Sequence, residues 1–289
     1  MGGIHVVIYR RDRVYHAIIA VVLIMIGLIC LFPMLYVVSV SLTPYEEFLR
    51  KGGIVLIPSK PTLEAYGMFW TEPYVASNFM NTVFITIVGT VLNLAVTVLM
   101  AYALSKRDLI FRKGFIFFCL IPLLIGGGMI PTYLVVRNTG LTNTLWALML
   151  PTLVSPYILL ITRTFFESVD QSLHESARID GAKEFTVLWH IILPVSTPIL
   201  ATIGLMYGVE HWNEYFGGLL YISDPEKRTL QVVLREMLRR ADSMDVDTVV
   251  PTRTLQMAGV VITAVPIIVV YPFLQKHFTQ GIMLGAIKG

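Results

Sequence analysis

Charged residues are scarce in this sequence. They make up 14% of its 289 positions, whereas hydrophobic residues make up 55%. Ordinary soluble domains contain about 25% charged residues. A water-soluble fold of this length could not bury so much apolar surface, so the scarcity of charge favours a fold embedded in lipid.

Cysteine is scarce as well. Cys30 and Cys119 are the only two, and both lie inside apolar stretches, where a thiol behaves as a small hydrophobic group. This arrangement supports neither a disulfide framework nor a metal site. The formal net charge of +3 is small, and no basic run with interleaved aromatic residues indicates a nucleic-acid partner.

Motifs for nucleotide binding and for catalysis are missing too. The sequence contains no G-x-x-x-x-G-K-[ST] motif, and Gly126-Gly127-Gly128 favours a flexible or closely packed helix instead. The six histidines are scattered and form no H-E-x-x-H pattern. We therefore expect the chain not to be an enzyme and to bind no cofactor or metal itself.

Long windows without Asp, Glu, Lys or Arg are present instead. A helix needs about 20 apolar residues to cross a hydrocarbon core of roughly 30 Å. The first window, Val14–Tyr45, is too long for the hydrophobic region of a secretory signal, which spans roughly 7–15 residues. The windows predict an all-α integral membrane fold of about six transmembrane helices, near 15–40, 80–104, 115–136, 144–166, 195–218 and 254–274.

Basic residues near the short loops indicate the orientation. Three arginines precede the first span and four basic residues crowd the loop between the second and third, which favours cytoplasmic termini; the basic segment after the fifth span disagrees. The expected parts are a cytoplasmic N-terminus (1–14), one transmembrane domain (15–274) and a cytoplasmic tail (275–289). The domain carries outer loops at 41–79 and 222–253 and a cytoplasmic loop at 167–194. The second outer loop contains apolar residues at helical spacing, which predicts an amphipathic helix from Leu230 to Leu238.

The cytoplasmic loop predicts a helix–turn–helix along the inner membrane surface. Asp180-Gly181 is a turn signal between two short helical patterns. In the second pattern one apolar stripe is expected, formed by Phe185, Leu188, Trp189 and Ile192. Small residues around the turn would let another protein approach closely. The alternative is an ordinary amphipathic loop with a chance Asp-Gly turn.

This loop resembles the "EAA" loop of permease subunits in binding-protein-dependent ABC importers. The matching residues are Glu175-Ser176-Ala177, Asp180-Gly181-Ala182 and Leu193-Pro194. In that family the loop docks into a cleft of the ATPase subunit and converts its closure into movement of the spans. The resemblance therefore implies an ATPase-coupling role for Glu175, Ser176, Ala177, Asp180, Gly181, Ala182, Leu193 and Pro194. Ser176 stands where relatives usually have alanine, and Asp170 where they often have proline.

Further segments narrow the resemblance to the maltose-type second permease of carbohydrate importers. They run through most of the chain: Pro61–Tyr66, Gly140–Ala147, Arg163–Phe166, Trp212–Phe216 and Gly281–Gly289. Leu230–Arg235 is similar to the branch that carries complex, often acidic, plant- or algal-polysaccharide fragments. The family implies a homologous second permease subunit, two ATPase subunits that bind ATP and Mg, a solute-binding protein outside the cell, and a place in the bacterial cell (inner) membrane among its lipids.

Polar residues at the outer end of the fifth span are candidates for the sugar pathway. Ionisable side chains within a span are costly, so they usually face a cavity or a partner. The candidates are Glu210, Trp212, Asn213, Glu214 and Tyr215. The alternative is that they lie at the membrane interface, where such residues are tolerated.

A secondary transporter or channel that works without an ATPase is the alternative function. It predicts internal repeats and buried charges in several spans. Charges are nearly absent from all predicted spans but the fifth, and no repeat is evident. The sequence therefore favours the sugar or oligosaccharide importer.

Overall fold

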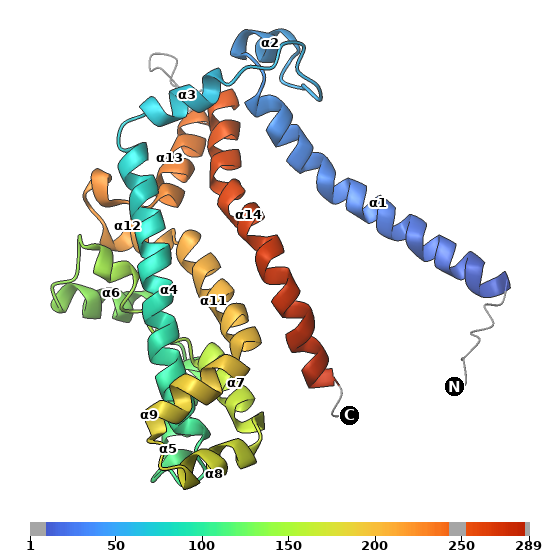
Figure 1. The fold of residues 1–289 in the computed structure, drawn as a ribbon. Helices are drawn as coiled ribbons and strands as arrows, with labels where there is room; N and C mark the ends of the chain where they lie inside the picture. The colour runs from blue at the N-terminus through green and yellow to red at the C-terminus, as the bar shows by residue number, and fades with distance from the viewer. Residues whose placement is uncertain (1–9, 243–252, 287–289) are drawn as a thin grey trace. The chain divides into compact units, whose positions relative to one another are not determined.

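The computed structural model describes residues 10–242 and 253–286, and every regular element within these residues is a helix (Figure 1). The chain divides into two units. Unit 1 comprises Met1–Thr71 and Met237–Ile262, and unit 2 comprises Glu72–Glu236 and Thr263–Gly289. The all-α prediction is confirmed for the described residues.

The helices follow one another closely along the chain. Unit 1 begins with α1 (Arg10–Ser41), α2 (Tyr45–Arg50) and α3 (Glu64–Thr71). Unit 2 holds α4 (Val75–Ser105), α5 (Arg112–Leu124), α6 (Met129–Asn138), a 3-10 turn η1 (Leu145–Leu148), α7 (Pro156–Ser168), α8 (Gln171–Ile179), α9 (Glu184–Val187), a π-helical turn η2 (Leu188–Ile192), α10 (Leu193–Val195), α11 (Thr197–Trp212), α12 (Phe216–Tyr221) and a 3-10 turn η3 (Pro225–Lys227). The last two helices, α13 (Leu230–Asp242) and α14 (Arg253–Ala286), each contribute to both units.

Three helices among the described residues are long and apolar enough to cross a membrane. They are Tyr15–Ser41 within α1, the whole of α4, and Arg253–Val270 within α14. Two bent pairs raise the number to five if each is one span: α5 with α6, bent by 115°, and Glu184–Val195 with α11, bent by 84°. The first bend falls at the triple glycine, where Gly128 has a φ of +79° that glycine adopts without strain.

Two predicted boundaries differ from the structure. The span expected at 144–166 is a continuous helix only from Pro156 onward. Proline is favourable in the first turn of a helix, because the backbone N–H that it lacks would have no partner within the helix there. The 13 residues of α7 extend about 20 Å, short of the hydrocarbon core. At the other end of the chain, α14 continues to Ala286, so most of the expected tail at 275–289 is helical.

The first predicted outer loop folds back on the end of α1 within unit 1. Val40, Phe48 and Val55 form a small buried cluster. Ser39 Oγ donates to the carbonyl of Val55 at 2.9 Å. The hydroxyl of Tyr36 donates to the carbonyl of Gly53 at 2.8 Å. These contacts give the loop a defined structure.

Glu47 holds the same loop closed through charge. Its carboxylate accepts from the Ser59 amide at 2.8 Å and pairs with Lys51 Nζ at 2.7 Å. The Lys51 hydrogen bond, followed by those of Ser59, lowers the pKa of Glu47 from an ordinary 4.5 to about 2. Since the folded pKa lies below the unfolded one, this carboxylate stabilises the loop above pH 4.5 and ceases to do so as the pH falls toward 2.

We expect Glu47→Ala to accelerate hydrogen exchange at the Ser59 amide at neutral pH, because the acceptor that protects it is removed. The difference from the unmodified chain should shrink as the pH is lowered through the range from 4.5 to 2. Glu46→Ala is the control, since the Glu46 side chain is exposed. Equal exchange in Glu47→Ala and the unmodified chain at pH 7 would contradict this role.

Helix α4 is the axis of unit 2. It packs along α11 and α7, and in Figure 1 the short helices α8 and α9 lie at its C-terminal end. Near its N-terminal end, Thr82 Oγ1 accepts from the Leu230 amide at 2.8 Å; near its C-terminal end, Tyr102 contacts Glu184. Thr82 and Tyr102 are 20 positions apart on the helix, which corresponds to about 30 Å, the thickness of a hydrocarbon core. The two hydrophilic segments 167–194 and 222–236 thus lie at opposite ends of one membrane-length helix.

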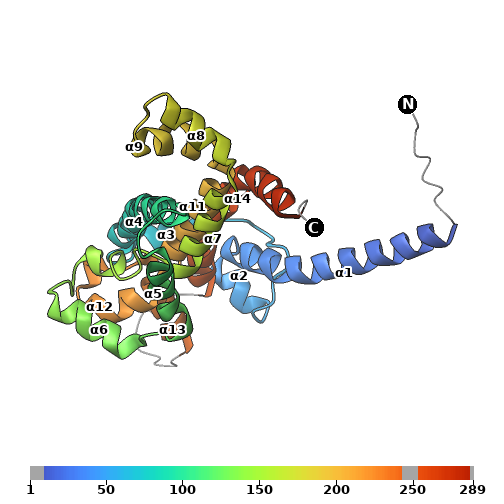
Figure 2. The ribbon, with the colours of Figure 1, turned by 90° about the horizontal axis from the view of Figure 1, so that it is seen from below.

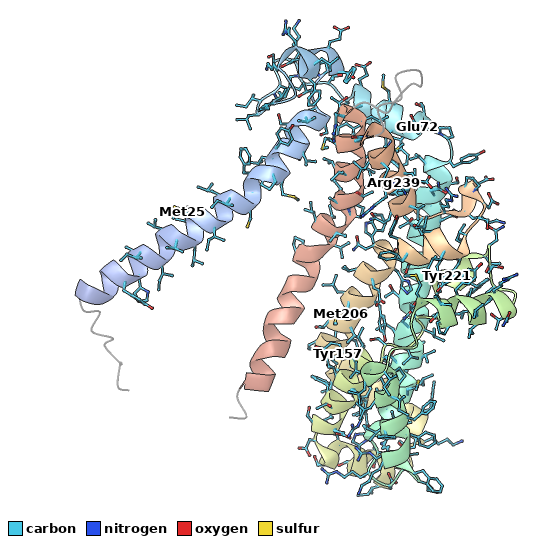
Figure 3. All side chains as sticks on the ribbon, turned by 180° about the vertical axis from the view of Figure 1, so that it is seen from behind. Met25, Glu72, Tyr157, Met206, Tyr221 and Arg239 are labelled. Carbon is cyan, nitrogen blue, oxygen red and sulfur yellow. The ribbon has the colours of Figure 1, made fainter. Side chains whose placement is uncertain are left out.

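Several contacts brace the N-terminal end of α4 and the segment beside it. The Asn81 amide donates to the carbonyl of Glu226 at 2.8 Å. The backbone amide of Asn143 donates to the carbonyl of Tyr221, the residue labelled in Figure 3, at 2.7 Å. The ring of Tyr221 stacks on the ring of Tyr133 of α6, with the ring centres 6.2 Å apart. The loop before α7 is therefore fixed to the segment that follows α11.

Candidate functional site

The candidate site is the hairpin formed by α8, the turn at Asp180-Gly181, and α9 to α10, seen side by side in Figure 2. Helix α8 begins after Asp170, whose carboxylate accepts from the Ser172 amide at 2.9 Å. This hydrogen bond lowers the pKa of Asp170. Asp170 thus caps the helix at the position where proline would otherwise start it.

The predicted turn closes α8 through a specific arrangement of backbone hydrogen bonds. The Ala182 amide donates to the carbonyl of Ala177 at 2.9 Å, around Gly181 at a φ of +77°. This is the Schellman arrangement, in which glycine occupies the left-handed position after the last helical residues. A Cβ on Gly181 would meet no atom within 4 Å. Glycine is needed here for its backbone conformation and not for space.

The apolar residues after the turn do not form the single stripe that was predicted. Leu188 and Ile192 are buried, whereas Phe185 is 66% and Trp189 is 59% exposed. Leu188 and Ile192 are four residues apart and share one face of the helical segment, and this face meets the core. Phe185 and Trp189 are also four residues apart and share the adjacent face, which does not. The rings of Phe185 and Trp189 stack on each other at 6.3 Å and point away from the bundle.

The residues expected to couple to an ATPase fall into two groups. Ser176, Asp180, Gly181 and Pro194 are exposed, and Ala182 and Leu193 are half-buried. Ala177 is only 7% exposed and packs into the core with Val98, Leu104 and Ile192, so it attaches the hairpin to the bundle. The Glu175 side chain lies outside the described residues.

A cluster of four side chains, which we call the hairpin clamp, ties the hairpin to α4. It comprises Tyr102, Lys106, His174 and Glu184. The Glu184 carboxylate accepts from the Tyr102 hydroxyl at 2.6 Å and pairs with Lys106 Nζ at 2.9 Å. Lys106 Nζ also lies 3.1 Å from His174 Nδ1 and 4.4 Å from the centre of the Tyr102 ring, on which the His174 ring stacks. Both arms of the hairpin therefore meet one lysine at the end of α4.

A second ionic network lies where the hairpin leaves α7. Glu167 Oε1 accepts from Arg163 at 2.7 Å and also pairs with Arg112, whose Nε donates to the carbonyl of Leu104 at 2.8 Å. Arg112 thus joins the ends of α4 and α7. In the sequence, Lys106 and Arg112 indicate only the orientation of the chain, and nothing in their positions indicates contact with the hairpin.

The candidate pathway residues at the end of α11 have separate roles in the structure. Trp212 is buried, and its indole Nε1 donates to the carbonyl of Thr263 at 2.9 Å. Asn213 Nδ2 donates to the carbonyl of Val209 at 2.9 Å, and Glu214 Oε1 accepts from the Gly217 amide at 2.7 Å. Glu210 is exposed, and Tyr215 is half-buried. Asn213 and Glu214 therefore bond to the backbone at the end of the helix and help to shape it.

A buried polar network that the sequence did not reveal joins α4 to α11. His211 Nε2 lies 3.0 Å from Asn93 Oδ1, and Asn93 Nδ2 donates to the carbonyl of Thr152 at 2.7 Å. One turn away, the hydroxyls of Tyr207 and Thr97 lie 2.8 Å apart. Satisfied pairs of this kind fix the register of two helices inside a membrane.

Gly89 makes room for this network, because a Cβ there would lie 2.5 Å from His211 Nε2. We expect Gly89→Ala to displace the imidazole and to destabilise the protein by about 1–3 kcal/mol, the usual penalty for overpacking. Gly204→Ala is a matched control in the same interface, since its Cβ would lie 3.5 Å from Leu94 Cδ1, an ordinary contact. The unfolding midpoint in detergent should fall by several degrees in the first variant only; equal midpoints would refute the steric role of Gly89.

An apolar cavity of about 570 Å³ opens between α4, α11 and the part of α14 in unit 2. Phe79, Leu205, Trp212 and Ile267 are among its lining residues. Almost no polar surface lines it, so it suits hydrocarbon or an apolar side chain better than the hydroxyl groups of a sugar. Trp212 lines this cavity, and its role in a sugar pathway stays a prediction.

Comparison with known proteins gives consistent matches over most of the chain. The family model described as "Binding-protein-dependent transport system inner membrane component" matches residues 93–284. The polygalacturonan/rhamnogalacturonan transport system permease protein YtcP of Bacillus subtilis is 38% identical over 96% of this chain and 100% of its own length. Protein LplC of the same organism is 40% identical over 91% of each chain.

A solved structure matches the fold. It is a crystal structure of a bacterial ABC transporter involved in the import of the acidic polysaccharide alginate. One of its chains is 30% identical to this one and superposes with a TM-score of 0.86, covering 93% of this chain and 98% of that one. The similarity therefore extends to the arrangement of the helices.

Proposed function

The chain belongs to the family of binding-protein-dependent transport system inner membrane components, and from this premise we propose that it is the permease subunit of an ATP-driven importer of acidic oligosaccharides. The observation that carries the proposal is the hairpin at the C-terminal end of α4, held there by the hairpin clamp. The other hydrophilic segment is attached about 30 Å away along the same helix. One end thus suits a motor and the other suits delivery of substrate.

The hairpin receives the work of an ATPase subunit on its exposed side. Ser176, Asp180 and Gly181 are exposed around the turn, where small side chains permit close approach of another protein. Two routes then lead into the bundle. One is covalent, through η2 and α10 into α11, and the other is the hairpin clamp, which leads into α4. Because α4 and α11 pack along each other, both routes move the same pair of helices.

The proposed partners are those that the family resemblance implies. Two ATPase subunits bind ATP and Mg, and this chain supplies no residue for that chemistry. A homologous second permease subunit completes the pathway, and an extracellular or periplasmic binding protein delivers the oligosaccharide at the opposite end of α4. With the hairpin on the cytoplasmic side, both termini lie in the cytoplasm of a bacterial cell.

The acidic character of the substrate is supported by two relatives. Polygalacturonan, named for the 38% identical permease, and alginate, named for the structural relative, are both polymers of sugar acids. The basic residues of the segment after α11 are compatible with such a substrate, because positive charge favours the approach of anions.

Purification and reconstitution test the proposal together. The chain, solubilised from the membranes of its native cells, should co-purify with a second permease and an ATPase. In proteoliposomes the complex should take up short galacturonate or alginate oligomers only with a loaded binding protein and ATP. Purification without any ATPase, together with uptake driven by an ion gradient, would support a secondary transporter instead.

A further inference from the structure

An arginine and two aromatic side chains meet just beyond the end of α11. The Arg235 guanidinium of α13 lies 5.2 Å from the centre of the Tyr215 ring. The Phe216 ring meets the Tyr215 ring edge-on at 5.2 Å and is 64% exposed. All three residues belong to unit 2.

Arg235 has no acidic partner among the described residues, in contrast to Arg228 and Lys227. Arg228 pairs with Glu236 at 2.7 Å, and Lys227 pairs with Asp224 at 3.4 Å. The Arg235 side chain is exposed and contacts a ring face instead. A guanidinium that lies over a ring face can still direct N–H groups at another ligand, and its fork of donors matches the two oxygens of a carboxylate.

The backbone that presents the two rings is fixed from both sides. Glu214 Oε1 accepts from the Gly217 amide at 2.7 Å, which closes the turn that contains Tyr215 and Phe216. The carbonyl of Glu214 accepts from Thr229 Oγ1 at 2.7 Å, one residue before α13 begins. The turn and the helix that carries Arg235 are therefore held together before any ligand arrives, which reduces the entropy lost on binding.

We propose that Arg235, Tyr215 and Phe216 form a recognition site for one uronate unit of an anionic oligosaccharide. Arg235 binds the carboxylate through its free N–H groups, and the exposed face of Phe216 packs against the C–H face of the sugar ring. The proposal rests on the proposed function. It means that this chain contributes to the selectivity of the transporter for acidic over neutral sugars. Of the five pathway candidates, it retains Tyr215 and adds two residues that the sequence did not single out.

The test uses the complete reconstituted transporter with saturating loaded binding protein. Initial uptake of a galacturonate trisaccharide is compared with that of a neutral trisaccharide under identical conditions. In Arg235→Gln the ratio of acidic to neutral uptake should fall about tenfold, the usual loss for one charge-assisted contact. Arg235→Lys should recover only part of the ratio, because lysine lacks the fork of donors. Phe216→Ala should lower uptake of the acidic trisaccharide, and Phe216→Tyr should not.

Lys227→Gln is the matched control, since it removes an exposed positive charge from the same segment without touching the proposed site. An equal fall in Lys227→Gln would reduce the effect to general electrostatics and overturn the site. So would an unchanged ratio in Arg235→Gln, or an effect seen only in vesicles containing anionic lipid, which would assign the arginine to a lipid headgroup. If the unmodified transporter takes up neither trisaccharide, the proposed function itself fails and the site falls with it.

Discussion

Reversing the charge of Lys106 is expected to separate ATP hydrolysis from transport. In Lys106→Glu, uptake should fall by at least tenfold while the complex still assembles and hydrolyses ATP. In the unmodified chain, Lys106 Nζ lies 2.9 Å from the Glu184 carboxylate. A glutamate at position 106 would place two negative charges near each other, and the contact of Lys106 with His174 would be lost. The hairpin would keep its covalent connection to α11 and the packing of Ala177 against α4, and it would lose the polar contacts of the hairpin clamp.

The size of the effect follows from the contacts that are lost. The ion pair is partly exposed, with 19% of the lysine and 50% of the glutamate side chain accessible, so screening limits its contribution to about 1 kcal/mol or less. The Tyr102 hydrogen bond to the same carboxylate adds about 1 kcal/mol, and two facing carboxylates are repulsive. A total of about 2 kcal/mol shifts the population of hairpins in which the clamp is closed about thirtyfold.

A charge swap distinguishes this mechanism from general damage. Lys106→Glu combined with Glu184→Lys restores the attraction with its direction reversed, and should recover a large part of uptake. Arg107→Glu is the control, because it makes the same change of charge at the next, exposed position. Failure of the swap to improve on either single variant would remove the clamp from the coupling route.

The features of this fold that depend on local sequence could be predicted from it. Windows of charge-free residues predicted α1, α4 and the apolar part of α14, because one side chain after another must be compatible with lipid. The Asp180-Gly181 turn was predicted because a left-handed position selects glycine whatever surrounds it. The amphipathic helix α13 was predicted by the spacing of Leu230, Leu234 and Met237, all of which are buried.

The features that depend on contacts between distant residues could not be predicted. Lys106 and Glu184 are 78 positions apart, and the local sequence around each residue gives no sign that the two are in contact in the fold. The pairing of His211 with Asn93 and the space left by Gly89 have the same origin. Periodicity also failed to choose between the two adjacent apolar faces of 185–192, because that choice is made by the core of α4 and α7 and not by the segment itself.

Substituting Gly181 by valine should uncouple the transporter even though the new side chain meets no other atom. The left-handed conformation at a φ of +77° is strained for any residue with a Cβ, by about 1–2 kcal/mol, and most of all for a β-branched one. Relief of that strain requires the turn to open and breaks the bond from Ala182 to Ala177. The exposed residues around the turn then lose the geometry in which they meet the ATPase subunit. The ratio of sugar imported to ATP hydrolysed should fall about tenfold or more.

The chain contains an internal control for this experiment. Gly140 closes α6 through the same Schellman arrangement, with a φ of +71°, a bond from the Leu141 amide to the carbonyl of Val136, and no atom within 4 Å of a Cβ. Gly140→Val therefore introduces the same backbone strain far from the hairpin, and should lower stability without changing the coupling ratio. Gly181→Asn should retain most coupling, because asparagine tolerates the left-handed region. If both valine variants lower the ratio equally, the loss comes from general destabilisation, and the turn at Gly181 has no special part in coupling.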